Sequence, residues 1–282
     1  MLSDFLSKTV MPVLFRIGPL NVYSYGLMMG IGFLVANYAA IKEFERKGLG
    51  ANFANEVTIL AVVFGIAGSK ILSLIENWGD FLRDPIGMAF SPGGLTWYGG
   101  FVLAAIMILW AARRKHFKML SVADALAPAL MLGYAVARLG CHFSGDGDYG
   151  LPTNLPWGVN YSNGIVPPSI AFRGFPQIES QYPGGIVPNN TLLHPTPIYE
   201  FFAGVAIFFL LWRLRKNLKP DGMLFMVYLV MAGLERLLVE FIRLNPRLLF
   251  GLSEAQLVSV VLIAIGVMGL IFLPRKTESA SR

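Results

Sequence analysis

The stretch Glu254–Leu273, EAQLVSVVLIAIGVMGLIFL, contains a single ionisable side chain, that of Glu254. A hydrocarbon core about 30 Å thick requires about 20 mostly apolar residues in a helix, and this stretch meets that requirement. Six more stretches do so: Val22–Ala40, Glu56–Ile75, Leu95–Ala112, Ser121–Cys141, Pro197–Leu214 and Gly222–Phe241. Because the runs are continuous and do not alternate, we expect helices and not a barrel. The sequence predicts an all-α, polytopic membrane protein with seven transmembrane helices in a single membrane-embedded domain, residues 1–282.

The composition agrees with this fold class. Of the 282 residues, 55% are apolar and 14% are charged, whereas a soluble domain carries about 25% charged residues. This excludes an ordinary soluble enzyme. The one cysteine, Cys141, excludes an intrachain disulfide, and with three histidines it leaves no zinc-binding spacing. We therefore expect no metal and no cofactor, and we expect Cys141 to be a small buried filler.

Positive charge is concentrated in alternate connections. Lys and Arg outnumber Asp and Glu by 23 to 17. The basic clusters are Lys42, Arg46 and Lys47; Arg113, Arg114, Lys115 and Lys118; Arg213, Arg215, Lys216 and Lys219; and Arg275, Lys276 and Arg282. The positive-inside rule places them in the cytoplasm, with the N-terminus outside and the C-terminus cytoplasmic. The surplus is therefore an orientation signal, and we expect no nucleic-acid partner.

The connection Ser144–Thr196 differs in composition from the others. It holds eight of the 17 prolines and only four charged residues. Long connections rich in turn residues tend to be functional loops. The sequence predicts a loop-rich exoplasmic cap, residues 144–196, above a site at membrane level.

The sixth apolar stretch carries charge where charge is costly. In ERLLVEFIR the residues Arg236, Glu240 and Arg243 are four and three positions apart and share one helical face. An ionised side chain inside a bilayer costs about 2.5–3.5 kcal/mol, which makes it a candidate for function. Two cations around one anion predict a net positive site suited to a phosphate. The alternative is a structural ion-pair ladder, with Arg243 extended to the outer interface.

A second charged motif, ARLGCHFSGDGDYG, ends the fourth stretch. Arg138 lies near the outer membrane boundary and is followed by a glycine-rich turn with His142, Asp146 and Asp148. Glycines let backbone N–H groups approach an anion, and histidine titrates near neutral pH. The alternative is an ordinary turn that leaves a helix, with solvated aspartates.

Three further motifs place aromatic, small or acidic residues near the outer ends of the spans. They are Tyr25 in SYGLMM; Tyr98, Gly99 and Gly100 in TWYGGF; and Tyr199 and Glu200 in HPTPIYE. An acid in the first turn of a span calls for a partner. The aromatic and small residues could equally serve the membrane interface or helix packing.

Taken together, five blocks resemble the bacterial prolipoprotein diacylglyceryl transferases over nearly the whole chain. The blocks are SYGLMMGIGF, PGGLTWYGGF, ARLGCHFSGDGDYG, HPTPIYE and ERLLVEFIR. The resemblance implies a seven-helix enzyme of the bacterial inner membrane with an exoplasmic head. It implies transfer of the diacylglyceryl group of phosphatidylglycerol to the lipobox cysteine of a prolipoprotein signal peptide, which forms a thioether and releases glycerol phosphate. Its partners would be membrane lipids and prolipoproteins.

The resemblance also assigns site residues. The two essential arginines of the family fall on Arg138 and Arg236. Other motif positions fall on Tyr25, Asp146, Gly150, Glu240 and Arg243. With Gly99, Gly100, Tyr199 and Glu200 they form the expected substrate-binding set.

Three positions depart from the family pattern. Tyr98 stands where a histidine is usual, Cys141 where an asparagine is usual, and Ala232 where a tyrosine is usual. We expect His142 or Tyr98 to accept the proton of the substrate thiol, because only the thiolate is nucleophilic. Arg138 and Arg236 would bind the lipid phosphate and stabilise charge on the leaving group.

Two other functions fit an intramembrane charge cluster. One is a transporter or channel, although no internal repeat supports it and the charges gather in the outer half. The other is a lipid-binding paralogue without transferase activity, which would bind phosphatidylglycerol and release no glycerol phosphate.

Overall fold

The computed structural model describes residues 2–18, 20–91 and 93–279. Two compact units make up the chain: Met1–Ala36 with Ala127–Arg282 form the first, and Asn37–Leu126 form the second. The single membrane-embedded domain, residues 1–282, stays a prediction.

Long helices account for every predicted apolar stretch. They are α2 (Ser24–Arg46), α3 (Ala51–Glu76), α6 (Trp97–Arg114), α7 (Met119–Ser144), α10 (Thr196–Leu214), α11 (Met223–Val239) and α12 (Glu254–Ser279). Among the described residues, five helices are long and apolar enough to cross a membrane: α2, α3, α7, α10 and the Glu254–Leu273 part of α12. The other two are shorter, with 18 residues in α6 and 17 in α11. The protein is therefore a mostly helical, multi-pass membrane protein.

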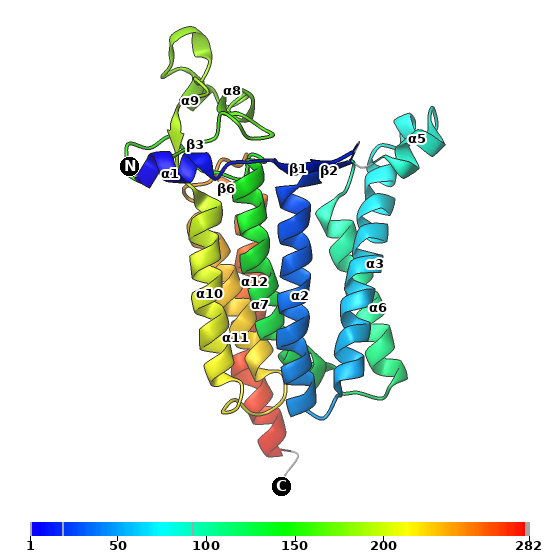
Figure 1. Ribbon diagram of the computed structural model, residues 1–282. Coiled ribbons are helices and arrows are strands. Elements are labelled where there is room, and N and C mark those ends of the chain that lie inside the picture. The colour runs from blue at the N-terminus through cyan, green and yellow to red at the C-terminus, as the bar shows by residue number, and fades with distance from the viewer. Residues whose placement is uncertain (1, 19, 92, 280–282) are drawn as a thin grey trace. The chain divides into compact units, whose positions relative to one another are not determined.

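Close helix contacts hold the first unit together (Figure 1). Helices α10, α11 and α12 pack against one another in chain order. A Cβ atom at Gly32 of α2 would lie 3.2 Å from the carbonyl oxygen of Gly133 in α7, and one at Gly204 of α10 would lie 2.9 Å from Cβ of Ala135 in α7. Small residues thus let α7 approach both α2 and α10.

The segment between α7 and α10 is a packed head with little regular structure. It contains β3 (Val159–Asn160) paired antiparallel with β4 (Leu192–Leu193), helices α8 (Pro168–Ala171) and α9 (Pro176–Glu179), and a 3₁₀ turn at Pro183–Gly185. Its buried core consists of Val10, Tyr149, Val159, Tyr161, Phe172, Val187 and Leu193. The predicted cap is thus loop-rich and packed, and its side of the membrane stays a prediction.

The N-terminal helix α1 (Leu2–Lys8) belongs to this head, which the sequence did not indicate. Ser3 Oγ donates a hydrogen bond to the carbonyl oxygen of Gly158 at 2.7 Å. Ser7 Oγ accepts one from the backbone N–H of Asn160 at 2.9 Å, and Val10 enters the head core.

Two further hairpins interrupt the otherwise helical fold of the first unit. The first joins β1 (Val13–Ile17) to β2 (Leu20–Tyr23) just before α2. The second joins β5 (Arg247–Leu249) to β6 (Leu252–Ser253) between α11 and α12. The all-α class therefore holds apart from three two-stranded pairs among the described residues.

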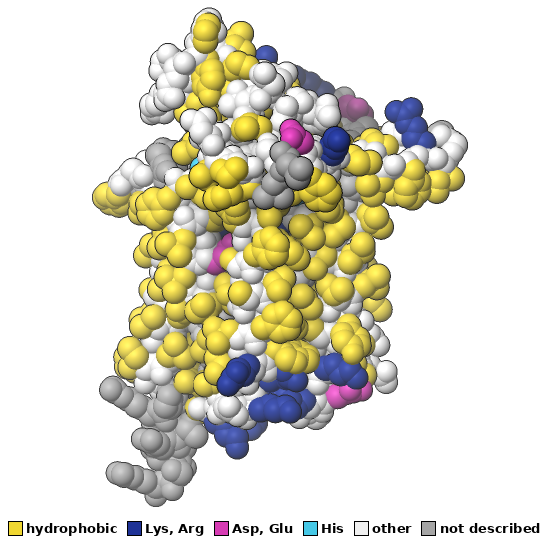
Figure 2. Space-filling view, turned by 60° about the vertical axis from the view of Figure 1, so that its left-hand side comes forward, with side chains coloured by type: hydrophobic (Ala, Val, Ile, Leu, Met, Phe, Trp, Pro, Cys, Tyr) yellow, Lys and Arg dark blue, Asp and Glu magenta, His cyan; other side chains and the backbone are white. Residues whose placement is uncertain are grey.

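Apolar side chains cover the flanks of the long helices (Figure 2). On α3 the exposed large side chains include Ile59, Val63 and Ile66. A soluble protein rarely exposes so much contiguous apolar surface, so these faces are suited to lipid.

In the second unit, α3 and α6 pack through glycine. A Cβ atom at Gly99 would overlap the carbonyl oxygen of Gly68, and one at Gly100 would overlap Ser69 Oγ. Helix packing therefore accounts for both glycines of TWYGGF. Their predicted role in substrate binding stays a prediction. Beyond α3 the chain forms two short helices, α4 (Trp78–Phe81) and α5 (Pro85–Phe90).

Replacement of Gly99 tests the packing. We expect Gly99→Val to lower the free energy of unfolding by about 1–3 kcal/mol, because the added carbons force α3 and α6 apart. Gly65→Ala in α3 is the control, since a Cβ atom there meets nothing within 4 Å. Thermal unfolding in detergent measures both. Equal stability of the two variants would contradict this packing.

Candidate active site

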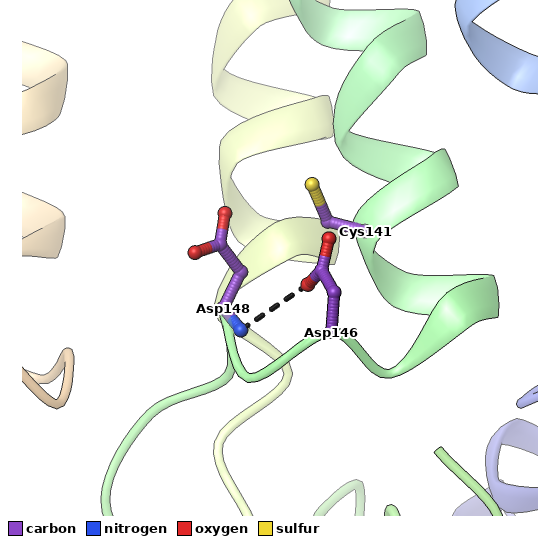
Figure 3. Close-up of side chains that lie close together, drawn as sticks. All are labelled: Cys141, Asp146 and Asp148. Atoms are coloured by element: carbon purple, nitrogen blue, oxygen red, sulfur yellow. Dashed lines mark hydrogen bonds between the residues drawn. The ribbon is translucent and has the colours of Figure 1, made fainter. Parts of the chain in front are cut away.

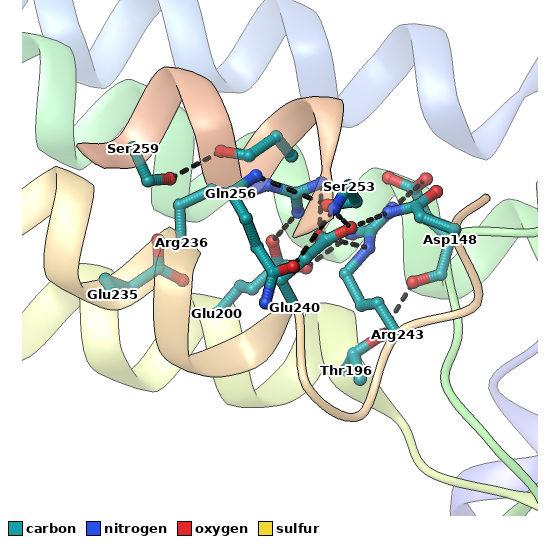
Figure 4. Close-up of polar contacts among 12 residues, drawn as sticks. Asp148, Thr196, Glu200, Glu235, Arg236, Glu240, Arg243, Ser253, Gln256 and Ser259 are labelled. Carbon is teal, nitrogen blue, oxygen red and sulfur yellow. Dashed lines mark hydrogen bonds and ion pairs between the residues drawn. The ribbon is translucent and has the colours of Figure 1, made fainter. Parts of the chain in front are cut away.

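A buried carboxylate at the start of α10 organises the charged residues of the first unit. Glu200 is 0% exposed. Its Oε1 atom lies 3.0 Å from Nη1 of Arg236 and 3.5 Å from Nε of Arg138, and its Oε2 atom lies 3.0 Å from Nη1 of Arg243. Three guanidinium groups, one from α7 and two from α11 and the residues after it, thus converge on one acid. Figure 4 shows Arg236 and Arg243 beside Glu200.

A second acid links two of these arginines. Asp148, in the turn after α7, accepts a hydrogen bond from Nη1 of Arg138 at 2.5 Å through Oδ2 and another from Nη2 of Arg243 through Oδ1. The sequence motif named Asp148 only as part of the turn. In the structure it is a direct partner of both arginines.

Backbone pairing fixes where Asp148 lies. Gly150 forms an antiparallel bridge with Arg243, and the backbone N–H of Leu151 donates to the carbonyl oxygen of Ile242 at 2.9 Å. A Cβ atom at Gly150 would overlap that carbonyl oxygen, so the close approach requires glycine. Thr196 Oγ1 also donates to the carbonyl oxygen of Asp148 at 2.6 Å. Gly150 therefore positions the charged residues by backbone contact, and its predicted contact with substrate stays a prediction.

Glu240 completes the network at the end of α11. Its Oε2 atom lies 3.0 Å from Nη2 of Arg236. Its Oε1 atom accepts hydrogen bonds from Ser253 Oγ at 2.7 Å and Asn245 Nδ2 at 2.6 Å. Ser253 belongs to β6, so the hairpin after α11 is tied to the site.

The charges in this network balance. Arg138, Arg236 and Arg243 face Asp148, Glu200 and Glu240. The predicted net positive charge is therefore wrong, because two of the acids come from other segments and the spacing within one helix cannot reveal them. The alternative interpretation placed Arg243 at the outer interface, and that part of it is also wrong, since the side chain is 6% exposed. Arg138 and Arg236 are 20% and 23% exposed, so part of each donor fork can receive an anion.

The two aspartates of the turn differ in ionisation. Burial raises the pKa of Asp148, but Arg243 and Arg138 outweigh it and lower the pKa to about 2. Burial raises the pKa of Asp146, and the neighbouring charge of Asp148 raises it further. Asp148 is therefore a permanent anion at neutral pH.

Cys141, Asp146 and Asp148 form a small cluster (Figure 3). One ligand atom of each lies within 4.8 Å of the others, a spacing that a metal ion could bridge. Both oxygens of Asp148 already accept hydrogen bonds from arginine. That fits an ion-pair network better than a metal centre, and the expected absence of a metal stays a prediction. Cys141 is buried, as predicted.

Two residues that the sequence reasoning missed join the network. The hydroxyl of Tyr134 lies 2.9 Å from Oε1 of Glu200 and 3.2 Å from Oε2 of Glu235. The guanidinium carbon of Arg138 lies 4.8 Å from the centre of the Tyr134 ring. Tyr134 is one turn before Arg138, and Glu235 directly precedes Arg236, so helical spacing and the cost of intramembrane charge could have found both.

Comparison with known proteins identifies the family of the chain. A sequence model described as "Prolipoprotein diacylglyceryl transferase" matches residues 12–272. Relatives named phosphatidylglycerol–prolipoprotein diacylglyceryl transferase include a protein of Clostridium tetani, 31% identical over 258 residues, which are 91% of this chain and 95% of that protein. Another, from Dehalococcoides mccartyi, is 31% identical over 275 residues, 96% of each chain. A third, from Nostoc sp., is 30% identical over 278 residues, 95% of this chain and 91% of that protein.

The chain belongs to the prolipoprotein diacylglyceryl transferase family. The resemblance drawn from the five sequence blocks is therefore confirmed. The positions at which the family's two essential arginines were expected, Arg138 and Arg236, both contact Glu200.

The two predicted proton acceptors, His142 and Tyr98, lie outside the network around Glu200. His142 is 2% exposed, and its ring nitrogens lie 2.7 Å from Thr9 Oγ1 and 2.9 Å from the Tyr161 hydroxyl. It is thus held in the head core. Tyr98 lies in the second unit, beside Trp97 in α6. The proposed role of each as proton acceptor stays a prediction.

Two further tyrosines lie near the head. Tyr199 accepts a hydrogen bond from Trp157 Nε1 at 2.8 Å. Tyr25 is the second residue of α2 and lies next to Gly140 of α7, where an added Cβ atom would lie 3.4 Å from the Cα atom of Tyr25. Their roles in substrate binding also stay predictions.

Acid titration tests the Asp148 ion pairs. The pKa of Asp148 lies below its ordinary value of 3.8, so its ion pairs stabilise the folded protein above that pH. We expect the stability difference between the unaltered protein and Asp148→Asn to be constant above pH 3.8 and to shrink as the pH falls towards about 2. Detergent unfolding curves over this range measure it. A difference that does not change with pH would contradict the assignment.

Proposed function

We propose that this protein transfers the diacylglyceryl group of phosphatidylglycerol to the lipobox cysteine of prolipoproteins, which forms a thioether and releases glycerol phosphate. The observation that carries the proposal is the convergence of Arg138, Arg236 and Arg243 on Glu200 in a chain that belongs to this transferase family. Membership of the family does not favour a transporter, a channel or an inactive lipid-binding paralogue.

The placement of the charges supports a site on one side of a membrane. In the first unit the charged residues lie at the end of α7, at the start of α10 and at the end of α11, which are the helix ends that adjoin the head. The basic connection between α10 and α11, with Arg213, Arg215, Lys216 and Lys219, joins the opposite ends of those helices. The positive-inside rule then puts the head and the network on the outer side of the inner membrane, with the N-terminus outside and the C-terminus in the cytoplasm.

All seven long helices would cross the membrane in this arrangement. Helices α6 and α11 have 18 and 17 residues, near the lower limit for a span. The connections 47–50, 115–118 and 215–222 are then cytoplasmic, and the segment 145–195 forms the exoplasmic cap.

The geometry suits displacement at the glyceryl carbon of the lipid. The partly exposed guanidinium groups of Arg138 and Arg236 bind the phosphodiester and stabilise the second negative charge that the departing glycerol phosphate acquires. Arg243 is buried, and it keeps Asp148 and Glu200 in place. The substrate thiolate attacks opposite the departing phosphate oxygen, so positioning supplies much of the rate. The signal peptide that carries the thiol would lie in the membrane below the head.

Conservative replacement of Arg236 tests the proposal. We expect Arg236→Lys to lower the rate by about 10²–10³-fold, because lysine keeps the charge and loses the planar fork that binds phosphate and Glu200 together. The assay is the mass increase of a synthetic lipobox peptide incubated with protein in phosphatidylglycerol vesicles. Arg173→Gln, at an exposed arginine of the head, is the control and should react at the unaltered rate.

Two results would contradict the proposal. The first is no mass increase with the unaltered protein. The second is unchanged transfer by Arg236→Lys, which would mean that Arg236 does not bind the reacting phosphate.

A further inference from the structure

One acid near the arginines has no cationic partner. Within the described part of the chain, no lysine or arginine nitrogen lies within ion-pair distance of Glu235, whereas Asp148, Glu200 and Glu240 each pair with arginine. The carboxylate of Glu235 contacts the Tyr134 hydroxyl, with Oε2 at 3.2 Å and Oε1 at 3.4 Å. A carboxyl group in a membrane helix without a counter-ion is costly and needs an explanation.

The Tyr134 hydroxyl bridges two acids with one proton. It lies 2.9 Å from Glu200 Oε1 and 3.2 Å from Glu235 Oε2. A hydroxyl can donate to only one acceptor at a time. Glu200 is neutralised by guanidinium groups, so Glu235 is the acid that can carry an added proton and then donate it to the Tyr134 oxygen. Glu235 and Tyr134 can therefore stay hydrogen-bonded to each other whether the Glu235 carboxyl group is ionised or protonated.

Other groups near Glu235 set its surroundings. On α7 they are Tyr134 and Arg138, on α10 Glu200, and on α11 Arg236 and Tyr228. In the proposed function Arg138 and Arg236 bind the lipid phosphate, which is joined through oxygen to the glyceryl carbon that reacts. A proton acceptor beside these arginines would therefore lie close to that carbon.

We propose that Glu235, held by the Tyr134 hydroxyl, accepts the proton of the substrate thiol, in place of His142 or Tyr98. This rests on the proposed function. The S–H bond breaks and its proton goes to the Glu235 carboxylate. The sulfur electron pair forms the bond to the glyceryl carbon, and the electron pair of the broken carbon–oxygen bond leaves with the phosphate. Glu235 then returns the proton to the released glycerol phosphate.

Tyr134 acts as a positioning residue. Its hydroxyl orients the Glu235 carboxylate, and its ring lies against the guanidinium group of Arg138. Tyr134 also packs against the buried cluster of Ala127, Met131, Ile207, Leu211 and Leu224. The buried His142 has both ring nitrogens in hydrogen bonds within the head, so it has no free nitrogen for a thiol.

A selenol substrate tests the proton transfer directly. A selenol is a stronger acid than a thiol and is largely ionised at neutral pH, so it needs no proton acceptor. The protein, in phosphatidylglycerol vesicles, is given lipobox peptides with cysteine or with selenocysteine at the acceptor position, and the mass increase is followed. We expect Glu235→Gln to lower the rate with the cysteine peptide by about 10²–10⁴-fold. The rate with the selenocysteine peptide should stay close to that of the unaltered protein.

Further variants complete the test. Tyr134→Phe should also lower the cysteine rate more than the selenocysteine rate, and Glu235→Asp should restore part of the cysteine rate. Glu45→Gln, at an exposed acid near the end of α2, is the matched control and should change neither rate. With Glu235→Gln the cysteine rate should rise only near about pH 8.5, where the thiol ionises unaided.

The outcomes separate the two proposals. If the unaltered protein modifies neither peptide, the proposed function fails. If it modifies both, and Glu235→Gln either loses both rates equally or keeps the full cysteine rate at neutral pH, the role of Glu235 is overturned and the proposed function stands. If Glu235→Gln does not fold, Glu235→Asp carries the test, and equal loss of both rates in folded Glu235→Asp overturns the role.

Discussion

A single buried carboxylate, Glu200, holds together three guanidinium groups from different parts of the chain. Each of those cations would be costly in a membrane without a partner, and Glu200 without them would be equally costly. The interaction therefore ties the start of α10 to the end of α7 and to the end of α11. It also leaves Arg138 and Arg236 partly open to a further anion, which is the property that the proposed reaction uses.

Several features outside the charged network help to hold the arginines and acids around Glu200 in place. Gly150 lets two backbone segments meet, so that Asp148 reaches Arg138 and Arg243 together. The head continues directly from α7 and into α10 and fixes both helix ends, and the hairpin β5–β6 supplies Ser253 to Glu240. With the acids and arginines balanced, an added acid such as Glu235 has no cation to neutralise it, which is why it is suited to take up and release a proton.

The long helices and several charged residues of the site could be predicted from the sequence. The charge balance and the place of α1 could not, for physical reasons. Apolar length alone located every long helix, and the cost of intramembrane charge singled out Arg236, Glu240 and Arg243. Glu200 was identified because an acid in the first turn of a span needs a partner. The charge balance was missed, because Arg236 and Glu200 lie 36 residues apart in the chain and Arg243 and Asp148 lie 95 apart, whereas one helix face shows only its own members. The entry of α1 into the head was missed because it depends on tertiary contacts with β3.

A double-mutant cycle between Glu200 and Arg243 tests most directly whether the shared carboxylate holds the arginines. The free energy of unfolding in detergent is measured for Glu200→Gln, Arg243→Gln, the double variant and the unaltered protein. Each single change leaves buried charge unpaired and should cost about 3–5 kcal/mol. The double variant restores the balance, so its loss should be smaller than the sum by about 0.5–3 kcal/mol. Additive losses would show that the two side chains do not depend on each other and would contradict this account.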